Sequence, residues 1–258
     1  MVNKLGTLHD EYRLYFQTFN RVWDYLRKCS EDVGDVASTI SKLRGYESPE
    51  MHSVLVNAGF IYLDGSKVDV DRLHTASEEF GLFTKKGDFL LDGRFIFPVK
   101  DVVGNVLALV GWFPDEKKYI TTPSRFFRKD VLYYGMEELN PNVGQNMVVV
   151  EGIFDRLSIK SIGYPCIAMM GSSTSKYKTA MYRLFRKVVA IPDLDKIGRK
   201  IMNEDSWNIP VGGSYLRLSD GVSKDIDDLI KANGKFRICS EIEYAFASGE
   251  REIVSKIS

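Results

Sequence analysis

Short runs of consecutive hydrophobic residues, separated by segments with hydrophobic positions at helical spacing, dominate the second half of the chain. A strand that is covered on both faces is hydrophobic throughout, so these runs predict buried strands. The predicted strands are residues 147–150, 165–170, 188–191 and 215–218. The segments between them predict helices, at residues 153–162, 176–185 and 198–203. Strand–helix alternation with short connections predicts right-handed crossovers and a parallel sheet, an α/β fold.

The first half has a different pattern. Hydrophobic residues recur at helical spacing over residues 11–28, and further helices are expected at 33–43, 49–58 and 69–80. From residue 83 the pattern predicts strands at residues 89–91, 94–99 and 106–110. Asp92-Gly93 and Gly104-Asn105 are turn signals between them, so a β-meander is expected. The last segment, 240–258, predicts a charged helix.

Four regions follow from these patterns: a helical N-terminal region (1–82), a basic β-rich subdomain (83–145), a parallel α/β domain (146–239) and a C-terminal helix (240–258). The fold class is therefore α/β, or α+β when the mixed helical and β first half is included. A length of 258 residues is compatible with one large domain or two modest ones.

Composition excludes several classes of protein. Hydrophobic content of 44% and charged content of 27% are ordinary for a globular chain. We expect no membrane association, because no hydrophobic run approaches the roughly 20 residues of a membrane helix, and no signal peptide. The cytoplasm is the expected compartment. The cysteines and histidines are scattered, three of each, so neither disulfides nor a zinc site is expected.

The charges are balanced overall, 35 basic against 35 acidic, which is not typical of nucleic-acid binders. Their distribution is uneven. The stretch from Arg94 to Lys129 holds seven basic and three acidic residues, with Tyr119, Phe126 and Phe127 among them. Cations mixed with aromatic rings suit a track for single-stranded nucleic acid. A solvated β-surface with aromatic residues in the core explains the stretch equally well.

Acidic residues follow three successive predicted strands. The carboxyl ends of parallel strands meet at one edge of a sheet, so we expect these side chains to converge. Crowded carboxylates repel one another and raise each other's pKa, a cost that a divalent cation relieves. Such oxygen ligands favour Mg²⁺ or Mn²⁺ and suit phosphoryl transfer. Each pair taken alone has a simpler explanation, as a solvated turn or a charge near a helix start. The residues are Glu151 with Asp155, Asp193 with Asp195, and Asp225 with Asp227.

These acidic segments resemble the Toprim signature. They are Glu151-Gly152-Ile153-Phe154-Asp155, Asp193-Leu194-Asp195 followed by Gly198, and Lys224-Asp225-Ile226-Asp227-Asp228-Leu229. Toprim domains occur in DnaG-type primases, type IA and II topoisomerases, recombination-mediator proteins and some nucleases. Upstream, Arg94-Phe95-Ile96-Phe97-Pro98-Val99-Lys100-Asp101, Lys118-Tyr119-Ile120-Thr121-Thr122-Pro123 and Phe127-Arg128-Lys129 resemble, in order and spacing, segments of the DnaG-type primase core. The resemblance covers roughly residues 81–230.

The resemblance implies a primase catalytic core that makes short RNA primers from ribonucleoside triphosphates on a single-stranded DNA template, in a bacterial or phage-infected cell. It implies catalytic roles for Glu151, Asp193 and Asp195, and two or more Mg²⁺ or Mn²⁺ ions. The implied metal ligands are Glu151, Asp155, Asp193, Asp195, Asp225 and Asp227. The implied nucleic-acid or nucleotide contacts are Arg94, Trp112, Lys118, Arg128 and Lys129.

Three departures from the family pattern change the expectation. Val110-Gly111-Trp112 stands where members usually have Gly-Gly-Arg, so one groove arginine is missing and Trp112 is a candidate to stack on a base. Pro192 and Ile197 flank the second acidic segment, where both are tolerable. There is no N-terminal zinc module and no helicase-binding domain in the sequence. This suggests a stand-alone core, a separate zinc-bearing partner or helicase, or an excised domain.

Two rival functions remain open. A Toprim nuclease would hydrolyse a phosphodiester with the same acids. A non-catalytic accessory protein would bind single-stranded DNA and keep the acidic site only as structure. A topoisomerase is not expected, because the chain is too short for strand passage.

Overall fold

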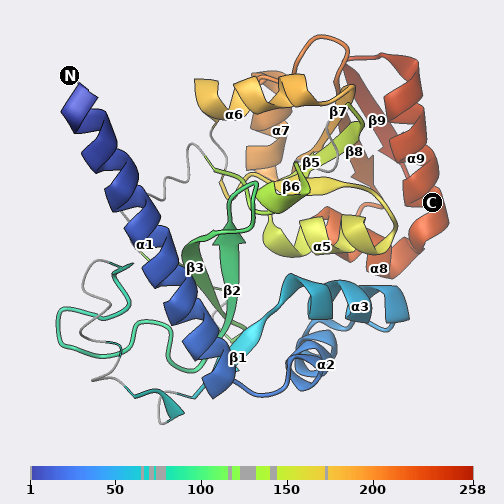
Figure 1. Cartoon of the computed structure of the whole chain (residues 1–258). Helices are drawn as coiled ribbons and strands as arrows, with labels where there is room; N and C mark the ends of the chain where they lie inside the picture. The colour runs from blue at the N-terminus through green and yellow to red at the C-terminus, as the bar shows by residue number, and fades with distance from the viewer. Residues whose placement is uncertain are drawn as a thin grey trace. The chain divides into compact units, whose positions relative to one another are not determined.

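The computed structural model of the chain describes residues 2–64, 67–69, 73, 80–115, 118–122, 132–139, 144–171 and 174–257, with only the backbone at 2–12, 118 and 138. The chain forms two compact units (Figure 1). The first is Met1–Arg44 with Leu55–Phe127, and the second is Gly45–Val54 with Arg128–Ser258. The predicted region boundary at residues 82/83 therefore falls inside the first unit. No helix within the described ranges has both the length and the apolar character needed to cross a bilayer.

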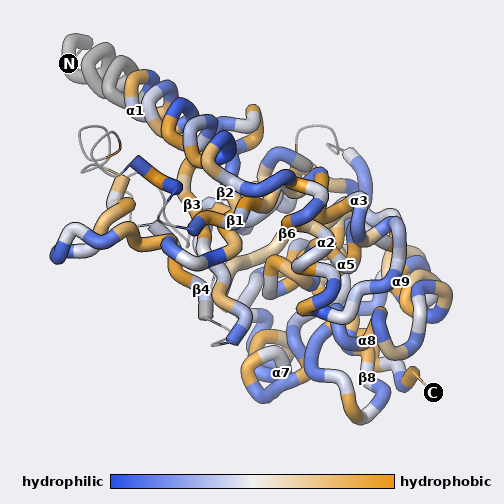
Figure 2. Tube along the Cα trace, turned by 90° about the horizontal axis from the view of Figure 1, so that it is seen from below, coloured by the Kyte–Doolittle hydropathy of each residue, from blue (hydrophilic) through white to orange (hydrophobic). Residues whose placement is uncertain are grey.

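The first unit is built on a four-stranded antiparallel sheet in the order β1-β2-β3-β4. The strands are β1 (Ile61–Leu63), β2 (Arg94–Lys100), β3 (Val106–Phe113) and β4 (Lys118–Thr121). Helix α1 (Val2–Cys29) packs on β3 and β1, and α2 (Val33–Arg44) packs on β1. Figure 2 shows hydrophilic and hydrophobic positions alternating along α1. Its hydrophobic side contributes Phe19 and Leu26, both fully buried, to the core of this unit.

Most predicted elements of the first half are present. The three N-terminal helices are confirmed, with α3 at Pro49–Ala58. The strand predicted at residues 89–91 is wrong: Phe89 makes one isolated bridge to Phe83, and the chain then turns toward Gly93. The hydrophobic run is explained by burial within a loop, since Leu91 is fully buried. The helix predicted at 69–80 lies almost wholly outside the described residues.

The second unit is a five-stranded parallel sheet in the order β6-β5-β7-β8-β9. The strands are β5 (Asn146–Val150), β6 (Cys166–Ala168), β7 (Lys187–Ile191), β8 (Ser214–Ser219) and β9 (Glu252–Lys256). The helices are α5 (Ile153–Ser161), α6 (Lys176–Met181), α7 (Lys196–Asn203), α8 (Ile226–Asn233) and α9 (Lys235–Ser248), with short 3₁₀ turns η3 (Met136–Glu138) and η4 (Tyr182–Leu184). Figure 1 shows α5 and α8 on one face of the sheet and α6 and α7 on the other.

The α/β prediction and its four parallel strands are confirmed, whereas the C-terminal helix over residues 240–258 is wrong in its second half. Helix α9 ends before Gly249, which has a φ of 72°, a left-handed conformation that favours glycine. The chain then adds β9 at the sheet edge, parallel to β8. Ile253 is buried and Val254 is 60% exposed, the alternation of a strand with one covered face.

Candidate metal centre

The acidic residues follow three strands whose carboxyl ends lie together. Val150 of β5 is in register with Ile191 of β7, so Glu151 and the residues after Ile191 leave the sheet at the same level. The loop after β7 is tied to the loop after β8 by a hydrogen bond in which the Leu194 N–H donates to the Lys224 carbonyl, at 2.8 Å. The predicted convergence of the three acidic segments is therefore what the fold produces.

Electrostatic coupling shows how closely the carboxylates approach one another. The pKa of Asp193 is raised to about 7, first by burial and then by the negative charges of Glu151, Asp225 and Asp195. Burial also raises the pKa of Glu151, with a contribution from Asp195 and an opposing hydrogen bond from the Asp193 backbone. Each of these shifts depends on carboxylates from other loops, so the charges form one cluster.

The pKa of Asp155 is raised well above its ordinary value, first by burial and then by the charges of Asp225, Asp193 and Asp227. With this residue included, all six predicted acids interact. A cluster that is costly to ionise in the absence of a cation is the electrostatic signature of a cation site.

Two of the acids are also N-caps. One carboxylate oxygen of Asp195 accepts from the Gly198 N–H at 2.8 Å at the start of α7. One oxygen of Asp225 accepts from the Asp228 N–H at 2.8 Å at the start of α8. Capping explains why a carboxylate favours these positions, and it fixes each side chain at the strand end. Because a carboxylate has two oxygens, capping and metal binding do not exclude each other.

Asp155 and Asp227 have a different environment, because internal donors reach both oxygens of each. Asp155 accepts from the Gly152 N–H at 3.1 Å and from the Asp227 N–H at 3.3 Å. Asp227 is fully buried; its oxygens accept from the Ser158 hydroxyl at 2.5 Å and the Lys231 ammonium at 3.1 Å. Neither Ser158 nor Lys231 could be predicted from the sequence, since a serine and a lysine on helices belong to no metal-binding motif.

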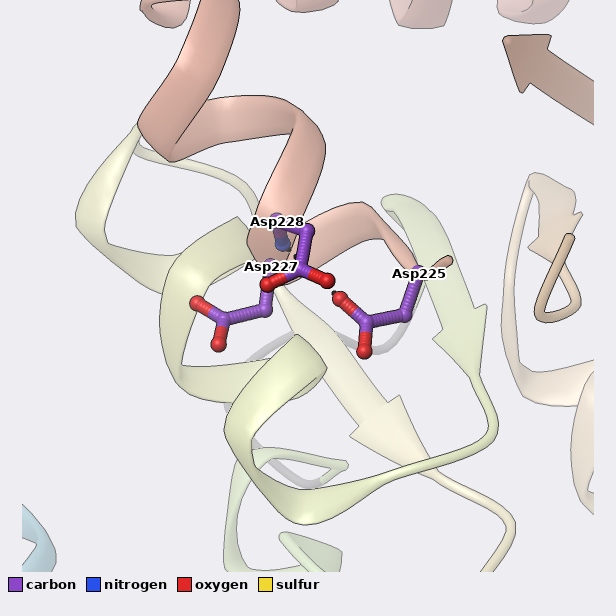
Figure 3. Close-up of side chains that lie close together, drawn as sticks. All are labelled: Asp225, Asp227 and Asp228. Atoms are coloured by element: carbon purple, nitrogen blue, oxygen red, sulfur yellow. Dashed lines mark hydrogen bonds between the residues drawn. The ribbon is translucent and has the colours of Figure 1, made fainter. Parts of the chain in front are cut away.

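Two features test whether the residues fit a divalent ion. The Oε2 atom of Glu151 is buried, and no hydrogen-bond partner reaches it in the described part of the chain. Asp225, Asp227 and Asp228 each offer a carboxylate oxygen, and these atoms lie within 4.8 Å of one another (Figure 3). Both the unsatisfied oxygen of Glu151 and the group of oxygen donors at the start of α8 call for a cation, and hard oxygen ligands of this kind suit Mg²⁺ or Mn²⁺.

The predicted nucleic-acid contacts belong to the first unit or lie outside the described residues. Arg94 is at the start of β2, with its guanidinium carbon 5.4 Å from the centre of the Phe113 ring. Its Nε and Nη1 atoms are buried, and neither finds an acceptor among the residues described. Lys118 begins β4, but its side chain is not described, and Arg128 and Lys129 fall outside the described ranges.

Trp112 corrects one expectation. Its side chain is only 3% exposed and packs on Phe95, with ring centres 5.6 Å apart. Both faces of β3 are buried along nearly its whole length, so the indole faces the core and is not available to stack on a base.

Comparison with known proteins places these features in a family. The Toprim-like family model matches residues 148–230, which contain all six predicted acids. The chain thus carries a Toprim-like domain. It is 28% identical over 183 residues, 65% of its length, to a DNA primase of Clostridium acetobutylicum. It is 31% identical over 116 residues to a DNA primase of Deinococcus radiodurans. The matches span 30% and 20% of these curated relatives, less than a third of either.

Solved structures extend the likeness over almost the whole chain. A DnaG primase catalytic domain bound to single-stranded DNA aligns with a TM-score of 0.74 at 20% identity, over 92% of this chain and 83% of that one. The zinc-binding and RNA polymerase domains of the Aquifex aeolicus primase align with a TM-score of 0.73 at 26% identity, over 90% and 60%. The resemblance inferred from the sequence is confirmed: the chain has the fold of a DnaG-type primase catalytic core with its Toprim domain.

Proposed function

We propose that this chain is a primase catalytic core that joins ribonucleoside triphosphates on a single-stranded DNA template. The observation that carries the proposal is the convergence of carboxylates from three strand ends, within a fold shared with DnaG catalytic cores. The reaction is attack of a 3′-hydroxyl on an α-phosphate, with loss of pyrophosphate.

Glu151, Asp193, Asp195 and Asp225 would hold the divalent ions, two or more Mg²⁺ or Mn²⁺. When bound, such ions neutralise charge on the attacking and leaving oxygens of a phosphoryl transfer. Burial keeps the carboxylates of Glu151 and Asp193 weakly solvated, and the caps of α7 and α8 hold Asp195 and Asp225 in place. We assign Asp155 and Asp227 to support of this arrangement, because internal donors already reach both oxygens of each.

Arg94 would bind a phosphate of the template or of the incoming nucleotide. Two nitrogen atoms of this guanidinium, Nε and Nη1, find no acceptor among the described residues, so the group keeps its charge and donors for a phosphate. Lys118, Arg128 and Lys129 are further proposed contacts to the nucleic acid or the nucleotide. A helicase and a zinc-bearing protein remain proposed partners for choosing where synthesis starts.

Template-directed synthesis on single-stranded DNA, with labelled ribonucleotides and Mg²⁺ or Mn²⁺, tests the proposal. Wild type is compared with Asp193→Asn/Asp195→Asn, with and without a preformed primer. Asparagine at 195 retains an oxygen that can cap α7, so the double variant tests chemistry rather than folding. Glu204→Gln is the matched control, because Glu204 is an exposed acid at the C-terminal end of α7, paired only loosely with Lys200, at 3.9 Å.

We expect wild type and Glu204→Gln to make short products, and the double variant to make none. Products that appear only when a primer is supplied would mean that this core elongates and that initiation requires a partner. Absence of synthesis at saturating metal in both formats would overturn the proposal. Metal-dependent cleavage of DNA lost in the double variant would then identify a Toprim nuclease, and DNA binding alone an accessory protein.

A further inference from the structure

Lys231 lies at the edge of the acidic cluster and makes two ion pairs there. Its ammonium nitrogen is 3.1 Å from an oxygen of Asp227 and 3.2 Å from an oxygen of Asp228. It also lies 5.4 Å from the centre of the Tyr46 ring, a cation–π distance. Three contacts from three residues fix the ammonium in one place.

The partner Asp227 needs a cation. Its side chain is fully buried, and a buried carboxylate without a compensating charge is strongly destabilising. Ser158 supplies a hydrogen bond but no charge. Asp227 in turn donates its backbone N–H to Asp155, so the position of Lys231 is transmitted to the loop that carries Glu151.

The place of the ammonium coincides with a group of potential metal ligands. Oxygen atoms of Asp225, Asp227 and Asp228 lie within 4.8 Å of one another, close enough for a shared cation, and Lys231 contacts two of these three residues. A divalent ion and the ammonium would compete for the same oxygens, and the ammonium is covalently tethered. Binding of the ammonium is therefore intramolecular, which favours it over an ion that must be captured from solution.

We infer that Lys231 is a positioning residue that serves as a built-in cation, occupying the Asp227–Asp228 side of the cluster in place of a divalent ion. The inference rests on the metal centre proposed above, and it confines bound ions to the side formed by Glu151, Asp193 and Asp195. A pocket of about 290 Å³ lined by Tyr46, Ser158, Ser161 and Lys231 adjoins the ammonium, so an ion can reach the position once the ammonium is removed.

Binding of Mn²⁺ alone, measured from the electron paramagnetic resonance signal of the unbound ion, tests this with the whole chain and no nucleotide. Lys231→Gln keeps a hydrogen-bond donor toward Asp227 but removes the charge, and we expect it to bind one additional Mn²⁺ per chain. Lys231→Arg should retain the wild-type stoichiometry. Lys235→Gln is the matched control, because Lys235 pairs with Glu50 at 3.1 Å on an exposed surface.

A second variant tests the same inference without disturbing a buried charge. Asp228 is 42% exposed on its side chain and contacts Lys231, so Asp228→Asn should fold and should leave Mn²⁺ stoichiometry and affinity at wild-type values. An unchanged stoichiometry in folded Lys231→Gln, or loss of a bound Mn²⁺ in Asp228→Asn, would overturn the inference. If wild type binds no Mn²⁺ at all, the proposed metal centre itself fails, which separates the two outcomes.

Discussion

A single methyl group added at Gly198 should displace the acidic residues Asp193 and Asp195 from their positions in the cluster. Gly198 lies in the first turn of α7, and a Cβ atom there would be 1.8 Å from the carbonyl oxygen of Asp193 and 2.7 Å from its carbonyl carbon. Ordinary contacts begin near 3.4 Å, so the helix start or the Asp193 backbone must move by more than an ångström. The obstructing atoms are backbone, so no side-chain rotation can relieve the clash.

The expected loss follows from this displacement. Elsewhere in a helix, replacing glycine by alanine favours folding by about 1 kcal/mol, so intrinsic propensity alone would make Gly198→Ala neutral or stabilising. Overpacking of this kind instead costs about 1–3 kcal/mol of stability. A misplacement of about 1 Å among catalytic groups costs on the order of 10²-fold in rate. We therefore expect primed synthesis by Gly198→Ala to fall about 100-fold, with weaker Mn²⁺ binding.

The assay is primed extension at saturating Mg²⁺, with urea unfolding measured in parallel so that only folded protein is compared. Gly34→Ala is the matched control: Gly34 is also in the first turn of a helix, but its Cβ would meet only the flexible carboxylate of Asp32, at 3.0 Å. We expect the control to extend primers at the wild-type rate. Wild-type rate and Mn²⁺ affinity in Gly198→Ala would refute the argument that the α7 start sets the positions of Asp193 and Asp195.

Three further predictions follow from the same contacts. In the metal-free protein, the folded Asp193 carboxyl keeps its proton up to about pH 7, whereas the unfolded one loses it near 3.8. Stability should therefore fall as pH rises from about 3.8 to about 7. Urea unfolding in a chelator should show this decline, and Asp193→Asn should reduce it. Arg94→Ala should weaken binding of single-stranded DNA. It should also reduce the slope of the log binding constant against log salt concentration by about 1, because the Arg94 nitrogen atoms that find no acceptor among the described residues would no longer hold a phosphate. An equal slope in Arg94→Ala and in the control Arg237→Ala, which removes an exposed ion pair on α9, would argue against that contact. Asp195→Ala and Asp195→Asn should lose synthesis equally, but only alanine should lower thermal stability, by about 1 kcal/mol, through loss of the α7 cap.

The elements that could be predicted are those in which one local pattern determines the outcome. Strands β5 and β7 are hydrophobic on both faces, and their helices carry apolar residues at helical spacing, so β5, α5 and β7 were found with nearly correct bounds. Strand β9 was not predicted because Ile253 is its one buried apolar residue and its partner β8 lies more than 30 residues earlier. Pairing between two strands that are so far apart in the sequence cannot be detected from the local hydrophobic pattern.

The acidic positions could be predicted from topology alone, because strand order brings Glu151, Asp193 and Asp225 to one edge. Which of the acids are buried and held by internal hydrogen bonds could not be predicted. That Asp227 is buried depends on how α8 packs against α5, a contact between helices that strand periodicity does not encode. Trp112 shows the same limit, since an aromatic residue in a basic stretch suits the core as well as a base stack, and only the burial of β3 decides.

The cap contacts change how acidic residues at helix starts are interpreted. A carboxylate beside a helix N-terminus is usually explained by the helix dipole, and that explanation is often set against a functional one. Here Asp195 and Asp225 each use one oxygen as a cap, and the cap is what holds the residue at the strand end with a fixed orientation. Asp155 and Asp227 are fixed instead by donors on both oxygens. The cluster is therefore assembled by contacts that would each look structural alone, and its chemistry depends on the raised pKa values that result from placing so many fixed carboxylates together.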